Sequence, residues 1–210
     1  MIGTRPDLSY DVTKLSQAMA KPTKAHLNMS KHVLKYIKGT LNYCLRYAKS
    51  ENPLKLIGYC DADCGGSEDR RSTSGYCFQL SNQGTLISWK SQKQRVVALS
   101  SCEAEYVAIT RAMQEANVLR QLYSDMTNSE RDTVILHVDN KGVIALSRNP
   151  VQHQRFKHID IKFHFIRSEI EEKVVDLLYV PSDHNIADLF TKPVSRRKLN
   201  DFSVIRGSSE

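Results

Sequence analysis

Acidic side chains occur where apolar segments of the sequence end, at positions where buried strands and helices would be expected to finish. They are Asp61 and Asp63 in LIGYCDAD, Asp139 in TVILHVD and Asp188 in NIADLF. A single aspartate at a strand end often makes a turn or caps a helix, so each position alone favours a structural role. Considered together they favour one shared site, because buried carboxylates repel one another and need a positive partner.

Two further acids, Glu103 and Glu105, begin a long predicted helix in the segment SSCEAEY. Apolar residues follow Glu105 at helical spacing, whereas the same spacing from Glu103 reaches Thr110 and Gln114. We therefore expect Glu105 to face the sheet and Glu103 to face mostly water. The strand period leaves the choice between positions 61 and 63 open, since both side chains lie on one face.

The acids predict a site for hard divalent cations. Carboxylate oxygens without a matching His/Cys cluster favour Mg²⁺ or Mn²⁺. Two such ions about 4 Å apart would hold both the attacking water and the leaving oxygen of a phosphodiester. We expect metal, rather than a basic side chain, to offset the charge of the carboxylates.

Hydrophobic periodicity predicts the elements that must position these acids. Residues 1–39 indicate two helices, followed by strands in LNYCLRY, LKLIGYC, GYCFQLS and TLISWK, the last two forming a hairpin. The remaining elements are a helix from about Ser100 to Asp125, a strand in TVILHVD, a helix in KGVIALSR, a helix from about His158 to Glu172, a strand in VVDLLYV and a short helix from about Asn185. This order indicates an α/β fold in which helices pack on a mixed sheet.

Charge and composition limit the kinds of protein that this sequence can encode. The net charge of +7 lies entirely in residues 1–50, which carry nine Lys/Arg and two Asp. This segment is either a phosphate-binding surface or a solvated helix face, and charge alone does not decide between them. The five cysteines, without a CxxC pair, indicate reduced and mainly buried thiols. No signal peptide or membrane-spanning run is evident, so we expect no membrane association and a cytoplasmic or nuclear location.

Several long motifs resemble the ribonuclease H domain of the Pol polyprotein of Copia-type LTR retrotransposons. They are GYCDADCGG, RRSTSGYCFQL, ISWKSQKQRVVALSSCEAEY, VDNKGVIALSRNP, KHIDIKFHFIR and VPSDHNIADLFTKP. TRPDLSYDVTKLSQ and KHVLKYIKGT resemble the connection that follows the reverse transcriptase. The resemblance implies a ribonuclease H-like α/β fold, with a five-stranded mixed sheet and flanking helices, preceded by two N-terminal helices. It divides the chain into a basic helical connection (1–50), a ribonuclease H-like domain (51–195) and a C-terminal tail (196–210).

The resemblance also implies an activity, which is hydrolysis of the RNA strand of RNA–DNA hybrids during reverse transcription. Its two Mg²⁺ (or Mn²⁺) ions would be held by four carboxylates, Asp61, Glu105, Asp139 and Asp188. The resemblance therefore selects Asp61, rather than Asp63, as the metal ligand. His184 is the candidate for proton transfer, and no small-molecule cofactor is implied. The candidate substrate contacts in matching motifs are Arg70, Arg71, Ser72, Asn140 and His158.

One residue departs from the family pattern, because Cys64 stands where Trp is usual, and the smaller side chain is expected to leave a destabilising void. The sequence contains no polymerase, integrase or protease motif, so it resembles the tail of a longer Pol. Three interpretations follow: an active ribonuclease H, acting in the cytoplasm or in a virus-like particle; a catalytically idle remnant that still binds nucleic acid through residues 1–50; and a fragment that works only when docked on a reverse transcriptase.

Overall fold

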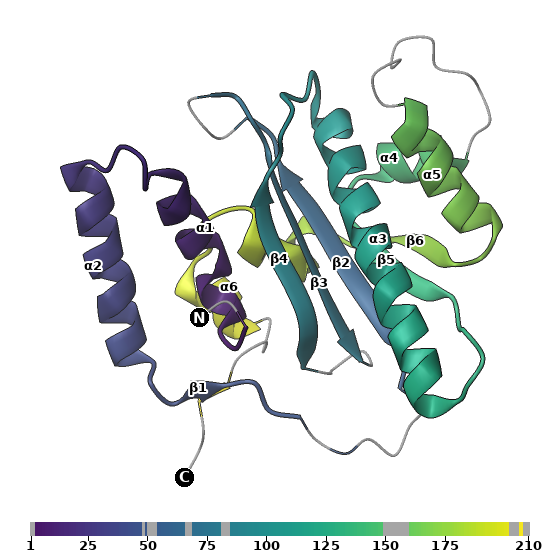
Figure 1. Cartoon of the computed structure of the whole chain (residues 1–210), viewed down its shortest axis with the longest axis horizontal. Coiled ribbons are helices and arrows are strands. Elements are labelled where there is room, and N and C mark those ends of the chain that lie inside the picture. The colour runs from purple at the N-terminus through teal and green to yellow at the C-terminus, as the bar shows by residue number, and fades with distance from the viewer. Residues whose placement is uncertain are drawn as a thin grey trace.

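A five-stranded mixed sheet forms the centre of the molecule (Figure 1). The computed structural model describes residues 3–47, 49, 54–65, 69–80, 85–148, 160–201 and 206–207. The strands, in spatial order, are β4 (Leu86–Lys93), β3 (Thr73–Leu80), β2 (Leu56–Asp63), β5 (Val134–Val138) and β6 (Val175–Tyr179). β3 pairs antiparallel with β4 and β2, whereas β5 runs parallel to both β2 and β6. The predicted α/β class and mixed sheet are confirmed.

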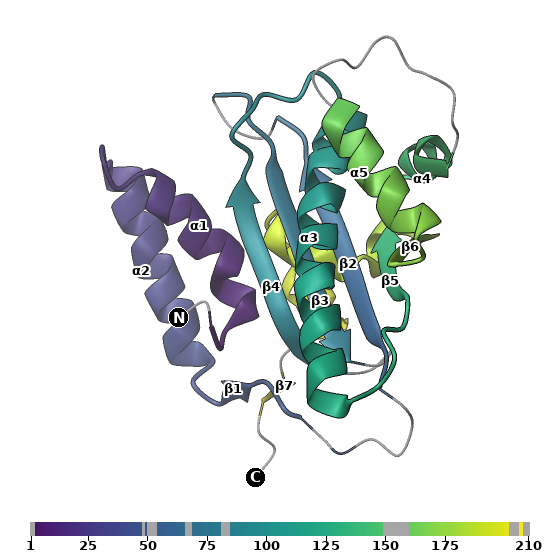
Figure 2. The ribbon, with the colours of Figure 1, turned by 45° about the vertical axis from the view of Figure 1, so that its right-hand side comes forward.

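Helices cover one face of the sheet. The long helix α3 (Ser101–Thr127) packs on β2 and β3, and α4 (Lys141–Arg148) and α5 (Asp160–Glu171) lie beside it (Figure 2). The Ser100 side chain caps α3 by accepting a hydrogen bond from the Glu103 amide at 3.2 Å. Tyr106, Ile109 and Met113 on α3 are buried against the sheet, where they form the main core. This helix therefore begins where the sequence predicted.

The opposite face of the sheet is covered by the short 3-10 helix η3 (Ile186–Phe190), shown in yellow behind the strands in Figure 2. Gly75 on β3 makes this close packing possible. A Cβ atom at Gly75 would lie 2.7 Å from Phe190 Cβ and 3.1 Å from the Ala187 carbonyl oxygen. Glycine at this position therefore allows η3 to pack directly against the backbone of β3.

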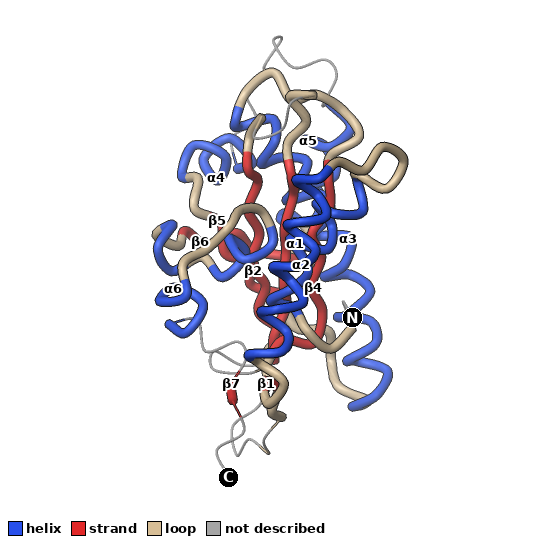
Figure 3. The backbone as a smooth tube through the Cα atoms, turned by 90° about the vertical axis from the view of Figure 1, so that its left-hand side faces the viewer, coloured by secondary structure: helices blue, strands red, loops and turns tan. Residues whose placement is uncertain are grey.

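The N-terminal helices lie along the β4 edge of the sheet (Figure 3). They are α1 (Ser9–Gln17), preceded by η1 (Pro6–Leu8), and α2 (Lys24–Gly39). Thr13 Oγ1 on α1 donates a hydrogen bond to the Ser91 carbonyl on β4 at 3.2 Å. The two predicted helices are confirmed, but their apolar face is only partly buried, because Leu27 and Leu34 are 54% and 62% exposed.

The strand predicted in LNYCLRY is reduced to β1 (Tyr43–Cys44), which pairs with β7 (Arg206–Gly207) outside the main sheet. The helix α6 (Arg196–Asp201) also lies within the segment that we predicted to be a C-terminal tail. None of the described helices is both long enough and apolar enough to span a bilayer.

The cysteines differ from expectation. Cys60 and Cys77 are buried, but Cys44 and Cys64 are exposed and Cys102 is intermediate. The prediction of a void at position 64 was therefore wrong, since a small side chain at the surface leaves no internal cavity.

Candidate active site

Three aspartates from distant parts of the chain meet at one edge of the sheet. Asp61 lies on β2, Asp139 directly follows β5, and Asp188 lies on η3. β2 and β5 are parallel neighbours with Tyr59 opposite His137, so Asp61 and Asp139 come side by side two residues later. One carboxylate oxygen of each aspartate lies within 4.8 Å of those of the other two. Among the described residues Asp63 does not belong to this group.

Polar side chains, two of them buried, fix the three aspartates relative to one another. Asn185, which is fully buried, donates from Nδ2 to the Cys60 carbonyl at 3.0 Å and accepts from the Ala187 amide at 3.1 Å. It therefore caps η3 and ties it to the strand that carries Asp61. Thr191 Oγ1 donates a hydrogen bond to Asp61 Oδ2, and Ser182 Oγ donates to Asp139 Oδ2 at 2.8 Å.

The three supporting residues were not found from the sequence. An asparagine directly before IADLF is a helix-capping signal, which would have identified Asn185. The hydroxyl contacts of Thr191 and Ser182 depend on how distant segments pack, so no local pattern identifies them.

Glu105 lies in the first turns of α3 and faces the same edge, as predicted. Its side chain is almost completely buried, and Oε2 has no hydrogen-bond partner in the part of the chain that the structure describes. Burial raises the pKa of Glu105 well above its ordinary value, and the charges of Asp61 and Asp139 raise it further. Glu105 therefore adjoins the aspartates, although it is not part of the group within 4.8 Å.

The prediction that Glu103 faces water was wrong, because Glu103 is only 7% exposed. Its carboxylate turns back toward the segment before the helix and accepts a hydrogen bond from the Leu99 amide at 2.6 Å. Glu103 therefore stabilises the start of α3 and takes no part in the aspartate group.

Two lysines neutralise part of the acidic charge. Lys192 Nζ lies 2.8 Å from Asp188 Oδ1 and 3.9 Å from Asp61 Oδ2, and Lys198 Nζ lies 2.5 Å from Asp188 Oδ2. Burial nevertheless raises the pKa of Asp61 to about 6, against the opposing effects of the Thr191 hydrogen bond and Lys192. The expectation that no basic side chain offsets these carboxylates was therefore wrong.

The residues fit a divalent-cation site. When all four acids are ionised, Asp61, Glu105, Asp139 and Asp188 carry more negative charge than the two lysines balance. Three carboxylates supply oxygens within 4.8 Å of one another, and Glu105 offers a buried oxygen without a partner among the described residues. Hard oxygen donors of this kind suit Mg²⁺ or Mn²⁺.

The remaining sequence-predicted residues lie outside this cluster. His184 is exposed on η2 (Ser182–His184), and Asn140 Oδ1 accepts from the Val143 amide at 3.1 Å at the start of α4. Arg70 and Arg71 are exposed, and Arg71 forms an ion pair with Asp69 at 3.8 Å. Ser72 is fully buried, and its contact with substrate stays a prediction. His158 lies outside the described residues.

Comparison with known proteins identifies the proteins that this sequence resembles. The sequence is 38% identical over 201 residues to the retrovirus-related Pol polyprotein from transposon RE1 of Arabidopsis thaliana, a match that covers 95% of this chain. It is also 49% identical over 117 residues to the secreted RxLR effector protein 161 of Plasmopara viticola, which covers 55% of this chain and 80% of that protein. No family model matches the sequence.

Among solved structures, LC11-RNase H1 in complex with an RNA/DNA hybrid superimposes with a TM-score of 0.50 and 19% identity, over 65% of this chain and 94% of that one. This likeness shows that the fold is that of ribonuclease H. The chain spans only 14% of the length of the RE1 polyprotein. Sequence and fold together show that the chain belongs to the family of retrovirus-related Pol polyproteins of Copia-type transposons, with the fold of their ribonuclease H region.

Proposed function

We propose that this chain hydrolyses the RNA strand of RNA–DNA hybrids with two divalent ions, Mg²⁺ or Mn²⁺, held by Asp61, Glu105, Asp139 and Asp188. The observation that carries this proposal is the convergence of three aspartate oxygens within 4.8 Å. The kinship with Pol polyproteins supports it, since such hydrolysis would belong to reverse transcription in the cytoplasm or in a virus-like particle. The RNA/DNA hybrid named in the LC11-RNase H1 structure supports the choice of substrate.

Each carboxylate has a distinct task in this proposal. Bound divalent ions would supply Lewis acidity that activates water and stabilises the leaving oxygen. Asp61 and Asp139 would set the spacing of the ligands, because Asp61 lies on β2, Asp139 directly follows the neighbouring strand β5, and Thr191 and Ser182 orient the two carboxylates. Glu105 would hold one ion, and its Oε2, which has no hydrogen-bond partner among the described residues, would accept a hydrogen bond from the ribose 2′-OH that distinguishes RNA from DNA.

Asp188 would have to exchange partners before its oxygens could hold an ion. Lys192 and Lys198 contact its two oxygens, and their side chains are 41% and 24% exposed. Both ammonium groups can therefore withdraw into solvent without rearrangement of the core. Asp188 is buried and held on η3, so it stays in place when they leave.

The proposed reaction breaks the bond between phosphorus and the 3′ oxygen of the RNA. The hydroxide part of water joins phosphorus, and a proton reaches the departing oxygen, so the products carry a 5′-phosphate and a 3′-OH. His184 is exposed and lies two residues from Ser182, which contacts Asp139. It is the proposed proton carrier, while Arg70 and Arg71 are proposed to contact backbone phosphates from the surface.

A cleavage assay tests the proposal. The full chain is incubated with an end-labelled RNA–DNA hybrid in Mg²⁺, Mn²⁺ or EDTA, beside the variants Asp61→Asn, Asp139→Asn and Asp63→Asn. Asp63→Asn is the matched control, because Asp63 lies on the same strand but outside the aspartate group. We expect metal-dependent cleavage that the first two variants lose and the control keeps. Cleavage in EDTA, or binding of the hybrid without cleavage, would refute the proposal, and the second result would favour the idle remnant.

A second candidate function is supported by the exposed apolar residues of the N-terminal helices. Leu27 and Leu34 on α2 are 54% and 62% exposed, although their spacing is that of a buried face. A chain that acts only when docked on a reverse transcriptase would cover these residues with its partner. Adding a polymerase fragment of the same Pol family to the cleavage assay distinguishes the two candidate functions. A chain that acts only when docked would cleave the hybrid only after the fragment is added, whereas an independent ribonuclease H would cleave it without the fragment.

A further inference from the structure

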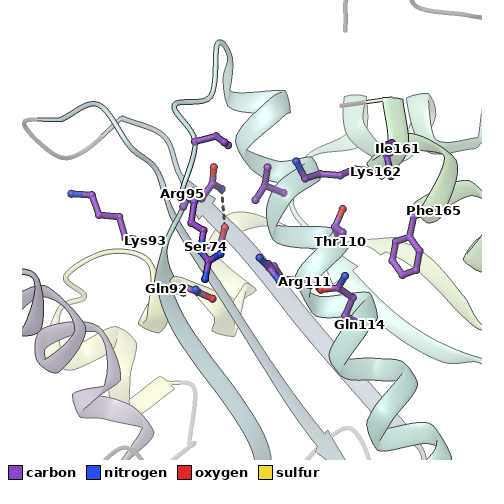
Figure 4. Close-up of a pocket in the computed structure, with 13 residues that line it drawn as sticks. Ser74, Gln92, Lys93, Arg95, Thr110, Arg111, Gln114, Ile161, Lys162 and Phe165 are labelled. Carbon is purple, nitrogen blue, oxygen red and sulfur yellow. Dashed lines mark hydrogen bonds between the residues drawn. The ribbon is translucent and has the colours of Figure 1, made fainter. Parts of the chain in front are cut away.

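A cavity of about 580 Å³, here called the N-terminal cavity, lies where the N-terminal helices meet the C-terminal part of the chain. Its walls come from η1, α1, α2 and β1 on one side and from η3, α6 and the residues between them on the other; η3 contacts α1, and the yellow C-terminal ribbon adjoins α1 in Figure 1. A different cavity, on the helical side of the sheet, is lined by the basic side chains Lys93, Arg95, Arg111 and Lys162 (Figure 4). The N-terminal cavity differs in charge, because Asp7 and Asp11 line it, and its size suits a small organic molecule.

The acidic charge of the N-terminal cavity is only partly balanced. Asp7 pairs with the Arg5 guanidinium at 2.8 Å and accepts a hydrogen bond from the Tyr36 hydroxyl at 2.8 Å. Asp11 is half-buried and has neither an ion pair nor a hydrogen bond with any residue that the structure describes. Burial raises the pKa of Asp11, and the neighbouring His32 lowers it by less. A cation bound beside Asp11 would therefore stabilise its charged form.

Lys192 also lines the N-terminal cavity, but its charge is engaged at the acidic site. Its Nζ lies 2.8 Å from Asp188 Oδ1 and 3.9 Å from Asp61 Oδ2. When His32 is neutral, Asp11 therefore contributes one uncompensated negative charge to the cavity. A ligand of charge +1 matches this balance.

The walls of the N-terminal cavity suit an organic cation better than a metal ion. A hard divalent ion takes about six oxygen ligands, whereas one unpaired carboxylate is available here. Aromatic and apolar side chains make up much of the lining, among them Tyr10, Tyr36, Tyr43, Val33, Leu189 and Leu199. The faces of tyrosine rings attract cations.

The chain itself shows this attraction at the same three rings. The Arg5 guanidinium lies 5.8 Å from the centre of the Tyr36 ring and 5.9 Å from that of Tyr43. Lys14 Nζ lies 5.5 Å from the centre of the Tyr10 ring. Acid and aromatic groups thus already hold cations around the N-terminal cavity, and Asp11 extends the same chemistry to a site that a ligand can enter.

We propose that the N-terminal cavity binds a small organic monocation, a protonated primary amine carried on an apolar or aromatic body. Its ammonium group pairs with Asp11, and its body lies against Tyr10 and the apolar side chains that line the cavity. This site goes beyond the proposed function, because it uses none of the four carboxylates and does not depend on hydrolysis. Lys192 separates the two sites, so the amine would lie next to a group that contacts Asp61 and Asp188.

Three probes of similar shape and different charge test the inference. The metal-free full chain is titrated at pH 7 with benzylamine, benzyl alcohol and benzoate, whose charges are about +1, 0 and −1, and NMR chemical shifts give the affinities. We expect benzylamine to bind about tenfold more tightly than benzyl alcohol, because a hydrogen bond to a charged group is worth more than a neutral one. Benzoate should bind more weakly than either, and the shifts should be largest at Tyr10 and Asp11.

Variants assign the contacts. Asp11→Asn should weaken benzylamine about tenfold and leave benzyl alcohol unchanged. Tyr10→Leu should weaken benzylamine about fivefold, whereas Tyr10→Phe keeps the ring and should bind like the native chain. Asp125→Asn is the matched control, because it removes one aspartate charge from the exposed end of α3, away from the residues that line the N-terminal cavity.

Equal affinities for benzylamine and benzyl alcohol would overturn the inference, and so would unchanged benzylamine affinity in a folded Asp11→Asn variant. If Asp11→Asn does not fold, the order of the three probes on the native chain still decides. Failure of the proposed function is separate. A chain that prefers benzylamine but leaves the hybrid uncleaved refutes only the proposed hydrolysis, and cleavage without any preference among the probes refutes only the amine site.

Discussion

Replacing Gly75 by alanine should disturb the acidic site without touching any acid. The new Cβ would lie 2.7 Å from Phe190 Cβ, 2.8 Å from Thr191 Cγ2 and 3.1 Å from the Ala187 carbonyl oxygen. Ordinary contacts begin at 3.4 Å, so η3 must move away from β3 by about 0.7 Å. One of the obstructing atoms belongs to the backbone, so rotation of a side chain cannot relieve the crowding.

The size of the effect follows from overpacking. We expect a loss of about 2 kcal/mol in the free energy of unfolding, or a melting temperature lower by about 4 to 8 °C. Because η3 carries Asp188 and Thr191 is its neighbour, hybrid cleavage should fall about 100-fold at a temperature where both proteins are folded. Urea denaturation in EDTA gives the stability, and the end-labelled hybrid gives the rate.

Gly39→Ala is the control for Gly75→Ala. Gly39 is the last residue of α2, and a Cβ atom there would have nothing within 4 Å. The control should be as stable as the native chain or more stable by up to about 1 kcal/mol, with unchanged cleavage. The packing argument would be wrong if Gly75→Ala kept native stability and cleavage, or if Gly39→Ala lost as much of both.

Three further predictions concern the charges of the site. In EDTA, the free energy of unfolding of Asp61→Asn should exceed that of the native chain by up to about 3 kcal/mol at pH 8, because burial raises the pKa of Asp61 to about 6 and the native protein then holds a buried charge. Urea denaturation should show the difference between the two proteins shrinking as the pH falls through 6 toward 4, because protonation of Asp61 removes that charge. Thr191→Val should weaken Mn²⁺ binding about tenfold in calorimetry, and Thr191→Ser should restore it, because only the hydroxyl orients Asp61. Lys198→Met should tighten Mn²⁺ binding about fivefold, because its partly solvated ammonium group competes for Asp188; unchanged affinity would show that the ion pair does not oppose the metal.

The ends of the buried strands were predictable because hydrophobic burial and metal chemistry require different residues. In TVILHVD the apolar run stops at Asp139, directly after β5, and in LIGYCDAD it stops at Asp61, two residues before β2 ends, so in both segments the change of residue type marks the position that enters the aspartate group. The direction of Glu105 was also predictable, because the apolar residues that follow it repeat with the helical period. These are local signals that a single sequence contains in full.

The partners of the acids were not predictable from periodicity, because each partner lies outside the helix or strand that carries the acid. Glu103 became buried through a bond to the amide of Leu99, which the helical period does not describe. Lys198 reaches Asp188 only because α6 turns back onto the site after residue 195. The packing of η3 on Gly75 likewise requires the complete sheet.

The bond from Asn185 to the Cys60 carbonyl joins residues 125 positions apart, and Thr191 reaches Asp61 over 130 positions. A ribosome adds about 5 to 20 residues each second, so this separation corresponds to roughly 6 to 25 seconds of synthesis. During that interval the nascent strand β2 already carries Asp61 but has neither η3 nor Asp188 beside it. The acidic site therefore forms at the end of translation of this region, so the proposed cleavage of nucleic acid has to wait until η3 packs on the sheet.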